Sequence, residues 1–406
     1  MSSVSLHPPR PQLDVITIKP DMILAVVALG GLLFVPVLRS AGALIFLACG
    51  SALVARRLQF HIQLSLKYWY ILALPIFCLL SSVWSEYPAL TFRFSLQLMA
   101  TVGIAISIAS AVSARVFCQT LFALFSLAML ASILFGDVRN DTGAWLGIYG
   151  SKNALAGAAA TYVIICAAQV LDGSASSRYR LLAGAGLMVG IVLLLLAQSL
   201  SALLIVPPSL LILFLLLALY RLSPLQQVTV MIFAALASIF MMLLIVIFSD
   251  ALFAMMLETT GKDVTLTGRT ELWRIAVDLI AERPFFGMGY QAFWVKGHGA
   301  AEVLWYTFGI ESRSGFNFHN TYLSNAVEIG LAGVALQIII LYGAAIAALI
   351  WALRTRSAEA SLLFILVMMV VMVSFVEVPI FFQFSLRSVI VICAFVFALR
   401  GLSNAR

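Results

Sequence analysis

Long apolar stretches separated by short polar segments run along the chain from residue 21 onward. Runs of about 18 or more apolar residues are typical of membrane-spanning helices, because that length crosses the hydrocarbon core. We predict about twelve such spans, the second of them short. They cover residues 21–38, 41–55, 68–84, 94–114, 116–135, 153–171, 181–197, 201–220, 228–249, 321–351, 361–377 and 384–400. The pattern predicts an all-α polytopic membrane protein.

The same pattern divides the chain into four parts. Residues 1–20 form a polar tail that lacks the basic segment, apolar core and cleavage site of a signal peptide. Residues 21–249 carry the first nine predicted spans, 250–319 form one long polar segment, and 320–406 carry the last three spans and a short tail. No repeat of fixed period is visible, so we expect one membrane domain with one large insertion that contains short helices.

Composition agrees with the hydrophobic pattern. The hydrophobic fraction is 63% and charged residues make up 10%, whereas soluble domains are only about 45–50% apolar. The net charge of +7 comes from Lys and Arg scattered singly between apolar runs, which does not make a nucleic-acid surface. The five cysteines lie in apolar runs without CxxC spacing, which predicts small buried side chains rather than disulfides or metal ligands.

The basic residues of the short loops predict the orientation, because Lys and Arg gather on the inner side of a membrane. Placing the N-terminus inside puts these residues on the inner side: Arg56, Arg57, Lys67, Arg115, Arg178, Arg180, Arg221, Arg354, Arg356 and Arg400. The outer side then keeps fewer, namely Arg39, Arg93, Arg139, Lys152 and Arg387. We predict that both termini lie inside and that the insertion lies outside.

Within the insertion, "TGRTELWRIAVDLIAERPFFGMGY" predicts a short amphipathic helix. Apolar residues between Leu272 and Ile280 recur at helical spacing, and the Thr-Gly pair at the start can cap the helix. Pro284 stops its continuation, and Arg274 can pair with Asp278 on the polar face.

Arg269 occupies an unusual position in this helix. It lies at the edge of the apolar stripe and in the first turn, where the helix dipole disfavours a cation. Two explanations stay open. The guanidinium can bind a phosphate or pyrophosphate together with free backbone N–H groups, or it can reach toward lipid headgroups.

His319 lies where the polar segment "GFNFHNTYLSNAVEIGLAG" leads into an apolar helix. Asn320, Ser324 and Glu328 follow at spacings of four, and polar groups along a membrane helix usually face a cavity or the bundle interior. A structural, hydrogen-bonded histidine is one interpretation. The other is a general base that takes a proton from a hydroxyl near neutral pH.

Further polar residues lie at the outer ends of other spans. The segments "WSEYPALTFRFS" and "GIYGSKNALAG" place Arg93, Lys152 and Asn153 there. Each can be an interfacial anchor, or the cations can converge with Arg269 over one cavity that holds an anionic substrate. We expect no metal, because no recognisable triad is formed by the carboxylates of Asp263, Glu302 and Glu311.

Four segments resemble the O-antigen ligase and polymerase superfamily of bacterial membrane glycosyltransferases. They are "WSEYPALTFRFS", "GIYGSKNALAG", "GRTELWRIAVDLIAERPFFGMGYQAFW" and "FHNTYLSNAVEIGLAG". The ending "GMGYQAFW" resembles the exopolysaccharide-polymerase branch. The resemblance implies a C-type glycosyltransferase-like membrane fold, an undecaprenyl-pyrophosphate-linked glycan donor, and neither a metal nor another cofactor.

By matching position, the resemblance implies that Arg269 contacts the donor pyrophosphate. It implies that His319 orients or deprotonates the acceptor hydroxyl, so that attack inverts the anomeric carbon. The insertion would then face the periplasm from a bacterial inner membrane. We expect the remaining substrate-binding residues to be Arg93, Lys152, Asn153, Asn320, Glu328 and Arg387. The expected partners are the lipid-linked donor, an acceptor glycan and membrane lipids, with a possible flippase and chain-length regulator, and no nucleic acid.

The chain departs from the family pattern in "AQSLSALL". Ligases tend to carry a Ser-Arg pair there, and this chain has Leu200 in place of the arginine. Either Arg93, Lys152 or Arg387 supplies the missing charge, or the departure counts against a ligase; it slightly favours a polymerase.

Three classes of function are compatible with a membrane protein of this kind: an enzyme, a transporter, and a receptor or scaffold. The first hypothesis is an enzyme that polymerises lipid-linked repeats, and a ligase that moves a finished glycan onto lipid A–core or a protein shares its chemistry. A secondary transporter predicts charges at mid-membrane and two related halves, and the sequence has neither. A receptor or scaffold needs an extended inner domain, which the pattern does not predict.

Overall fold

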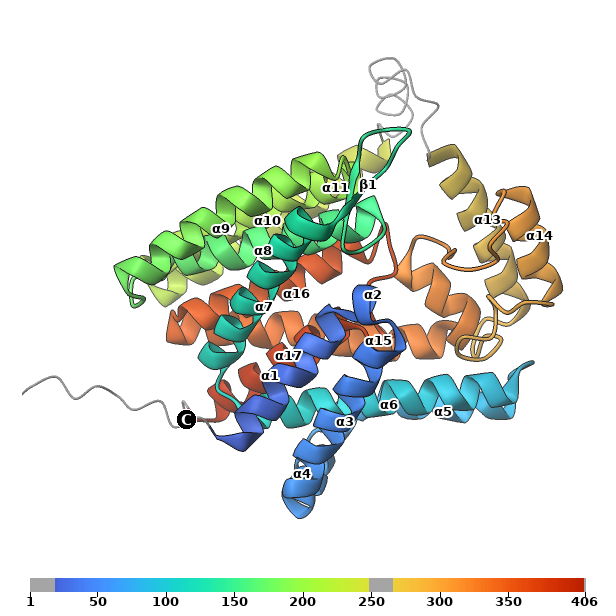
Figure 1. Cartoon of the computed structure of the whole chain (residues 1–406), viewed down its shortest axis with the longest axis horizontal. Helices are drawn as coiled ribbons and strands as arrows, with labels where there is room; N and C mark the ends of the chain where they lie inside the picture. Colours follow the sequence, from blue (N-terminus) through green and yellow to red (C-terminus); the bar gives the residue numbers. More distant parts are fainter. Residues whose placement is uncertain (1–18, 248–265, 405–406) are drawn as a thin grey trace, which may run out of the picture.

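The computed structural model describes residues 19–247 and 266–404 (Figure 1). Most of the predicted tail at 1–20, the end of the span at 228–249, and the first part of the insertion with Asp263 lie outside the described residues. The described chain is a bundle of helices, and α13 and α14 lie together at one end of it (Figure 1).

A helix occupies each predicted span. These helices are α1 (Pro20–Leu33) with α2 (Val35–Leu38), α3 (Ser40–Arg56), α5 (Trp69–Leu80), α6 (Pro88–Ala111), α7 (Ala114–Phe135), α8 (Lys152–Leu171), α9 (Ser177–Leu196), α10 (Leu200–Leu219), α11 (Pro224–Ile247), α15 (Thr321–Thr355), α16 (Ala358–Val373) and α17 (Leu386–Asn404). The all-α polytopic class is therefore confirmed.

Fewer helices meet the length of a full span. Within the described residues, seven are long and apolar enough to cross a membrane, or eight if α3 and α4 (Leu58–Lys67), bent by 99°, form one broken span. The shorter apolar helices include α1, whose C-cap is Phe34, and α5, which is followed by the 3₁₀ helix η1 (Ser81–Val83). The structure supports seven or eight candidate spans, and the count of about twelve stays a prediction.

The insertion contains α13 (Leu266–Glu282) and α14 (Gly299–Thr307). As predicted, Leu272 and Ala276 on the apolar stripe of α13 are buried, and Arg274 pairs with Asp278 at 3.4 Å. A small hairpin before α8 was not predicted. It is formed by the antiparallel strands β1 (Asp137–Val138) and β2 (Trp145–Gly147).

The interior of the bundle is built from α6, α8, α15, α16 and α17. α15 packs on α16 and α17, α17 on α6, and α8 on α9 and α10. The outward faces of α9 and α10 carry exposed leucines, as expected where lipid covers a helix. The cysteines are free thiols, four of them buried and Cys49 half-buried, so the prediction for them is confirmed.

Candidate functional site

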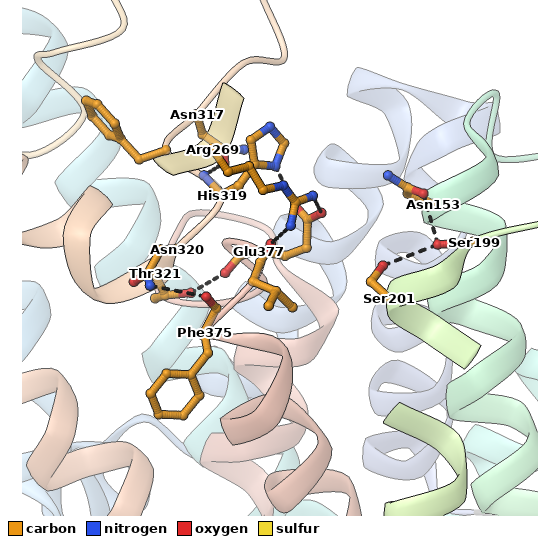
Figure 2. A network of polar contacts seen from close by, with 12 residues as sticks. Asn153, Ser199, Ser201, Arg269, Asn317, His319, Asn320, Thr321, Phe375 and Glu377 are labelled. Carbon is orange, nitrogen blue, oxygen red and sulfur yellow. Dashed lines mark hydrogen bonds and ion pairs between the residues drawn. The ribbon is translucent and has the colours of Figure 1, made fainter. Parts of the chain in front are cut away.

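Three side chains from distant parts of the sequence meet at one end of the bundle (Figure 2). Nη2 of Arg269 on α13 lies 3.2 Å from Oε1 of Glu377, in the loop between α16 and α17. Nδ1 of His319 lies 3.1 Å from Oε2 of the same carboxylate. Arg269 also donates from Nη1 to the Val376 carbonyl at 3.1 Å. The structure thus brings Arg269 and His319 together through one carboxylate.

The backbone around His319 fixes the imidazole. His319 has a φ of 48°, in the left-handed region that few residues other than glycine adopt. Its N–H donates to the Asn317 side chain at 2.7 Å, and Trp273 Nε1 on α13 donates to the Phe318 carbonyl at 2.8 Å. The Phe316 ring packs edge-on against the imidazole. Strained backbone that is held from several sides is common at functional sites.

Asn320 joins the start of α15 to the loop that carries Glu377. Its side-chain oxygen accepts from the N–H groups of Tyr322 and Leu323, which is an N-cap, and its amide donates to the Phe375 carbonyl at 3.1 Å. Thr321 Oγ1 donates to the Glu377 carbonyl at 2.8 Å. These contacts use the Asn320 side chain for structure, so they do not add to the case for a substrate contact.

A break in α15 fixes α13 relative to His319. Gly330 has a φ of 64° and a ψ of −178°, which interrupts the helix. After the break, the N–H groups of Leu331 and Ala332 donate to the carbonyls of Pro284 and Phe285. Before it, the carbonyls of Val327 and Glu328 accept from the N–H groups of Met288 and Gly289. The segment after α13 is therefore inserted into the break, as backbone groups inside a membrane protein must all find partners.

The break at Gly330 and the segment inserted into it are called the clamp below. Glu328 belongs to this clamp rather than to the His319 cluster. Its buried carboxylate accepts from the Gln291 N–H at 3.0 Å. Ser324, one turn before it, is buried, and its hydroxyl has no partner among the described residues. The expected polar line from Asn320 to Glu328 is therefore corrected, because the cap, the break and the docked segment use its members separately.

A cavity lies beside the cluster. It shares Glu377 with the cluster, while Asn153, Ser201 and Arg387 also line it, and its empty space of about 700 Å³ includes open solvent at its mouth. Asn153 Oδ1 accepts from Ser199 Oγ at 3.0 Å across the α8–α10 junction. Figure 2 shows Asn153, Ser199 and Ser201 on the side of the site opposite His319.

The predicted cations separate into two groups. Arg387 lines the cavity, whereas Arg93 and Lys152 do not. Arg93 is exposed and lies over the Phe94 ring at 4.5 Å, and Lys152 is the first residue of α8. Leu200, at the start of α10, is exposed. Among the described residues, Arg269 belongs to the cluster and Arg387 lines the cavity, whereas a substrate-binding role for Arg93 and Lys152 stays a prediction.

The ionisation of Glu377 decides the hydrogen bonding of His319. Burial raises the pKa of Glu377, but His319 and Arg269 lower it by more, and the net shift is downward. An ionised carboxylate only accepts hydrogen bonds, so Nδ1 of His319 carries the proton in this contact and Nε2 of a neutral imidazole is left as an acceptor. Among residues 19–247 and 266–404, no group of three His, Cys, Asp or Glu is placed to bind a metal.

Glu377 joins the cluster together, and the sequence analysis did not single it out. It lies at the end of an apolar run, in "VSFVEVPIFF", and no other acidic residue follows it in the chain. An acidic residue inside such a run is a functional signal in membrane proteins. That signal was present in the sequence, but the partners of Glu377 could not be read from it.

Comparison with known proteins relates part of this site to a family. Residues 183–338 match the O-antigen ligase family. This segment is therefore similar to an O-antigen ligase domain. Arg269 and His319 lie within the matched residues, whereas Asn153, Glu377 and Arg387 lie outside them. The resemblance found in the sequence is thereby confirmed.

A second similarity extends beyond the O-antigen ligase domain. The chain is 30% identical over 284 residues to the exopolysaccharide production protein ExoQ of Rhizobium meliloti. The alignment covers 68% of this chain and 64% of ExoQ, so the chain spans just under two thirds of that relative. The chain is thus a multi-pass membrane protein that is similar to the O-antigen ligase family over residues 183–338 and to ExoQ over 284 residues.

Proposed function

We propose that the protein is a polymerase that transfers a glycan from undecaprenyl pyrophosphate to a sugar hydroxyl of an acceptor glycan. The observation that carries the proposal is the carboxylate of Glu377, which holds a cation and an imidazole in one site beside a cavity. A cation for the leaving phosphate and a base for the attacking hydroxyl are the two groups that glycosyl transfer without a metal needs.

In this mechanism Nε2 of His319 accepts the proton of the acceptor hydroxyl as its oxygen attacks the anomeric carbon. The new glycosidic bond forms as the bond between that carbon and the pyrophosphate oxygen breaks, with inversion. Glu377 is a positioning residue: it orients the imidazole and stabilises the imidazolium. Arg269 keeps further N–H donors beyond the two used for Val376 and Glu377, and these stabilise the charge on the departing lipid pyrophosphate.

The membrane setting is part of the proposal. Successive helices alternate in direction through a twelve-span, C-type glycosyltransferase-like bundle in a bacterial inner membrane. The excess of Lys and Arg in the loops at the other end of the bundle supports a periplasmic location for the site.

The acceptor separates two versions of the proposal. The similarity to ExoQ favours polymerisation of exopolysaccharide, and Leu200 departs from the ligase pattern. If a deletion strain accumulates single lipid-linked repeats, the polymerase version is supported. Finished polymer accumulating on the lipid carrier instead would establish the ligase version.

The direct test is transfer by the purified protein. Full-length protein in nanodiscs is mixed with lipid-linked repeat units, and the products are sized on a gel with and without a chelator. A ladder of longer glycans that forms in both conditions supports the proposal. Complete absence of transfer, with a correctly folded protein and the natural repeat, contradicts it.

A further inference from the structure

The arginine of the cavity differs from the arginine of the cluster. In residues 19–247 and 266–404, no hydrogen bond or ion pair satisfies the guanidinium of Arg387, although Glu377 acts on it electrostatically. Arg269, in contrast, is already paired with Glu377 at 3.2 Å. A partly buried cation without a bonded counter-ion is costly, so this position favours an anionic ligand.

Two neighbours of Arg387 bear on what the guanidinium can bind. On α8, Gly157 faces the guanidinium, and a Cβ at this position would collide with Nη2 of Arg387. The buried hydroxyl of Tyr149 has no hydrogen-bond partner within the described residues. Burial raises the pKa of Tyr149, and the charge of Arg387 lowers it. The Arg387 guanidinium therefore lies against backbone that carries no side chain, and Tyr149 is a second donor without a partner in the described chain.

The rest of the cavity wall is apolar. Val373, Val370, Met369 and Leu366 from α16 continue the lining away from Glu377, and Ile205 and Ile390 face them from α10 and α17. Leu366 lies about two helical turns from Val373, so this wall extends roughly 10 Å. A cation at one end of an apolar cavity matches a ligand with an anionic head and a hydrocarbon tail.

We infer that this cavity holds the phosphate-proximal isoprene units of the donor lipid and that Arg387 binds its phosphate. The inference rests on the proposed function for the identity of the donor, but the chemistry it names is that of any prenyl pyrophosphate. Arg269 and Arg387 then contact the pyrophosphate from opposite sides of Glu377. Because Arg269 and His319 occupy both carboxylate oxygens, the Glu377 charge is partly neutralised and Arg387 is left for the ligand.

The test measures binding of farnesyl pyrophosphate to the full-length protein in phosphatidylcholine nanodiscs, with inorganic pyrophosphate and farnesol as the two half-ligands. We expect farnesyl pyrophosphate to bind at least about 10-fold more tightly than either half, because the site uses both charge and apolar contact. Equal affinity for pyrophosphate and farnesyl pyrophosphate would show that the apolar wall is not used, and would overturn the inference.

Three variants locate the binding site. Arg387→Gln should weaken farnesyl pyrophosphate binding about 10- to 100-fold, through loss of a charge-assisted hydrogen bond. Gly157→Ala keeps the charge and displaces the guanidinium, and Val373→Trp fills the apolar part; both should weaken binding in the same direction. Arg139→Gln is the matched control, since Arg139 pairs with Asp141 in an exposed turn. Wild-type binding by folded Arg387→Gln and Gly157→Ala proteins would refute the site.

The two proposals fail separately. If farnesyl pyrophosphate binds with the expected dependence on Arg387 while the protein transfers no glycan, the proposed function fails and the binding site stands. If glycan transfer is intact and the Arg387→Gln and Val373→Trp proteins bind farnesyl pyrophosphate like the wild type, the binding site fails and the function stands.

Discussion

The two ends of the helical bundle use polar side chains in different ways. At the end predicted to lie inside, Arg115 lies 3.8 Å from Glu359 and donates to Ser174, and Arg400 donates to the Ala109 carbonyl. Each contact ties the end of one helix to another. A cavity at this end is lined by Arg115 together with its partner Glu359.

At the opposite end one group of charges gathers around a cavity. Glu377 bonds both Arg269 and His319, and Arg387 faces the neighbouring cavity without a bonded partner in the described chain. The paired charges of Arg115 and Arg400 fix helix ends, whereas the cluster leaves one arginine free to meet a ligand in the cavity.

The largest effect is expected at Arg269. Arg269→Ala should reduce glycan transfer about 10³-fold, because it removes the cation that stabilises the leaving pyrophosphate. Transfer is measured with purified protein and lipid-linked repeats, and folding is checked by size-exclusion profile. Arg274→Ala, on the exposed face of the same helix, is the control. Wild-type product yields from Arg269→Ala would remove Arg269 from the mechanism.

His319 comes next. His319→Ala should lower the rate at least ~100-fold if the imidazole is the general base. His298→Ala, in the same insertion, provides a comparison. A loss of only a few-fold in single-turnover measurements would reduce the role of His319 to substrate positioning.

Glu377 is expected to act through His319. Glu377→Gln should slow transfer about 10- to 100-fold, since the amide no longer stabilises the imidazolium. In the His319→Ala background the same change should have a much smaller effect, and full additivity of the two losses would contradict the coupling. Glu302→Gln, which alters a carboxylate paired with Arg313, is the control.

The ion pairs of Glu377 also predict a pH dependence of stability. Because its pKa is lowered from 4.5 in the folded protein, its contribution is fully present above the ordinary carboxyl range and is lost as the pH falls through the lowered pKa. The difference in melting temperature between wild type and Glu377→Gln should thus be constant near neutral pH and should shrink only in acid. A difference that already disappears near pH 7 would contradict this assignment.

Breaking the clamp in α15 should affect stability first. Gly330→Ala should cost about 1–3 kcal/mol, because its backbone conformation is nearly restricted to glycine and a Cβ would collide with Phe285. Thermal unfolding measures the loss, with Gly343→Ala in the regular part of the same helix as the control. An unchanged melting temperature would show that the segment after α13 is not held by this break.

The smallest effect is expected at the other end of the bundle. Arg115→Gln and Glu359→Gln should each change stability by less than about 1 kcal/mol, as is usual for partly exposed ion pairs. Glycan transfer should stay near the wild-type rate in the same assay. A large loss of transfer would mean that charges at this end take part in function and would break the comparison.

The predictability of the fold and that of the site differ. Twelve apolar segments were enough to place every main helix, because burial in lipid requires both an apolar surface and a satisfied backbone. The breaks at Phe34 and Gly330 and the bend between α3 and α4 were not predicted, since neighbouring elements and not local composition stabilise them. For the same reason the sequence could not show that Arg387, and neither Arg93 nor Lys152, lines the cavity.

The amino-acid pattern was enough to show that the chain is a helical membrane protein, that its polar insertion carries an amphipathic helix, and that Arg269 and His319 are unusual for their positions. These conclusions follow from period, length and charge, which are local properties. The folded structure was needed to show that Glu377 joins Arg269 to His319 and that Arg387 faces a cavity. Such contacts join residues more than fifty positions apart, and their geometry depends on how three helices and two loops pack.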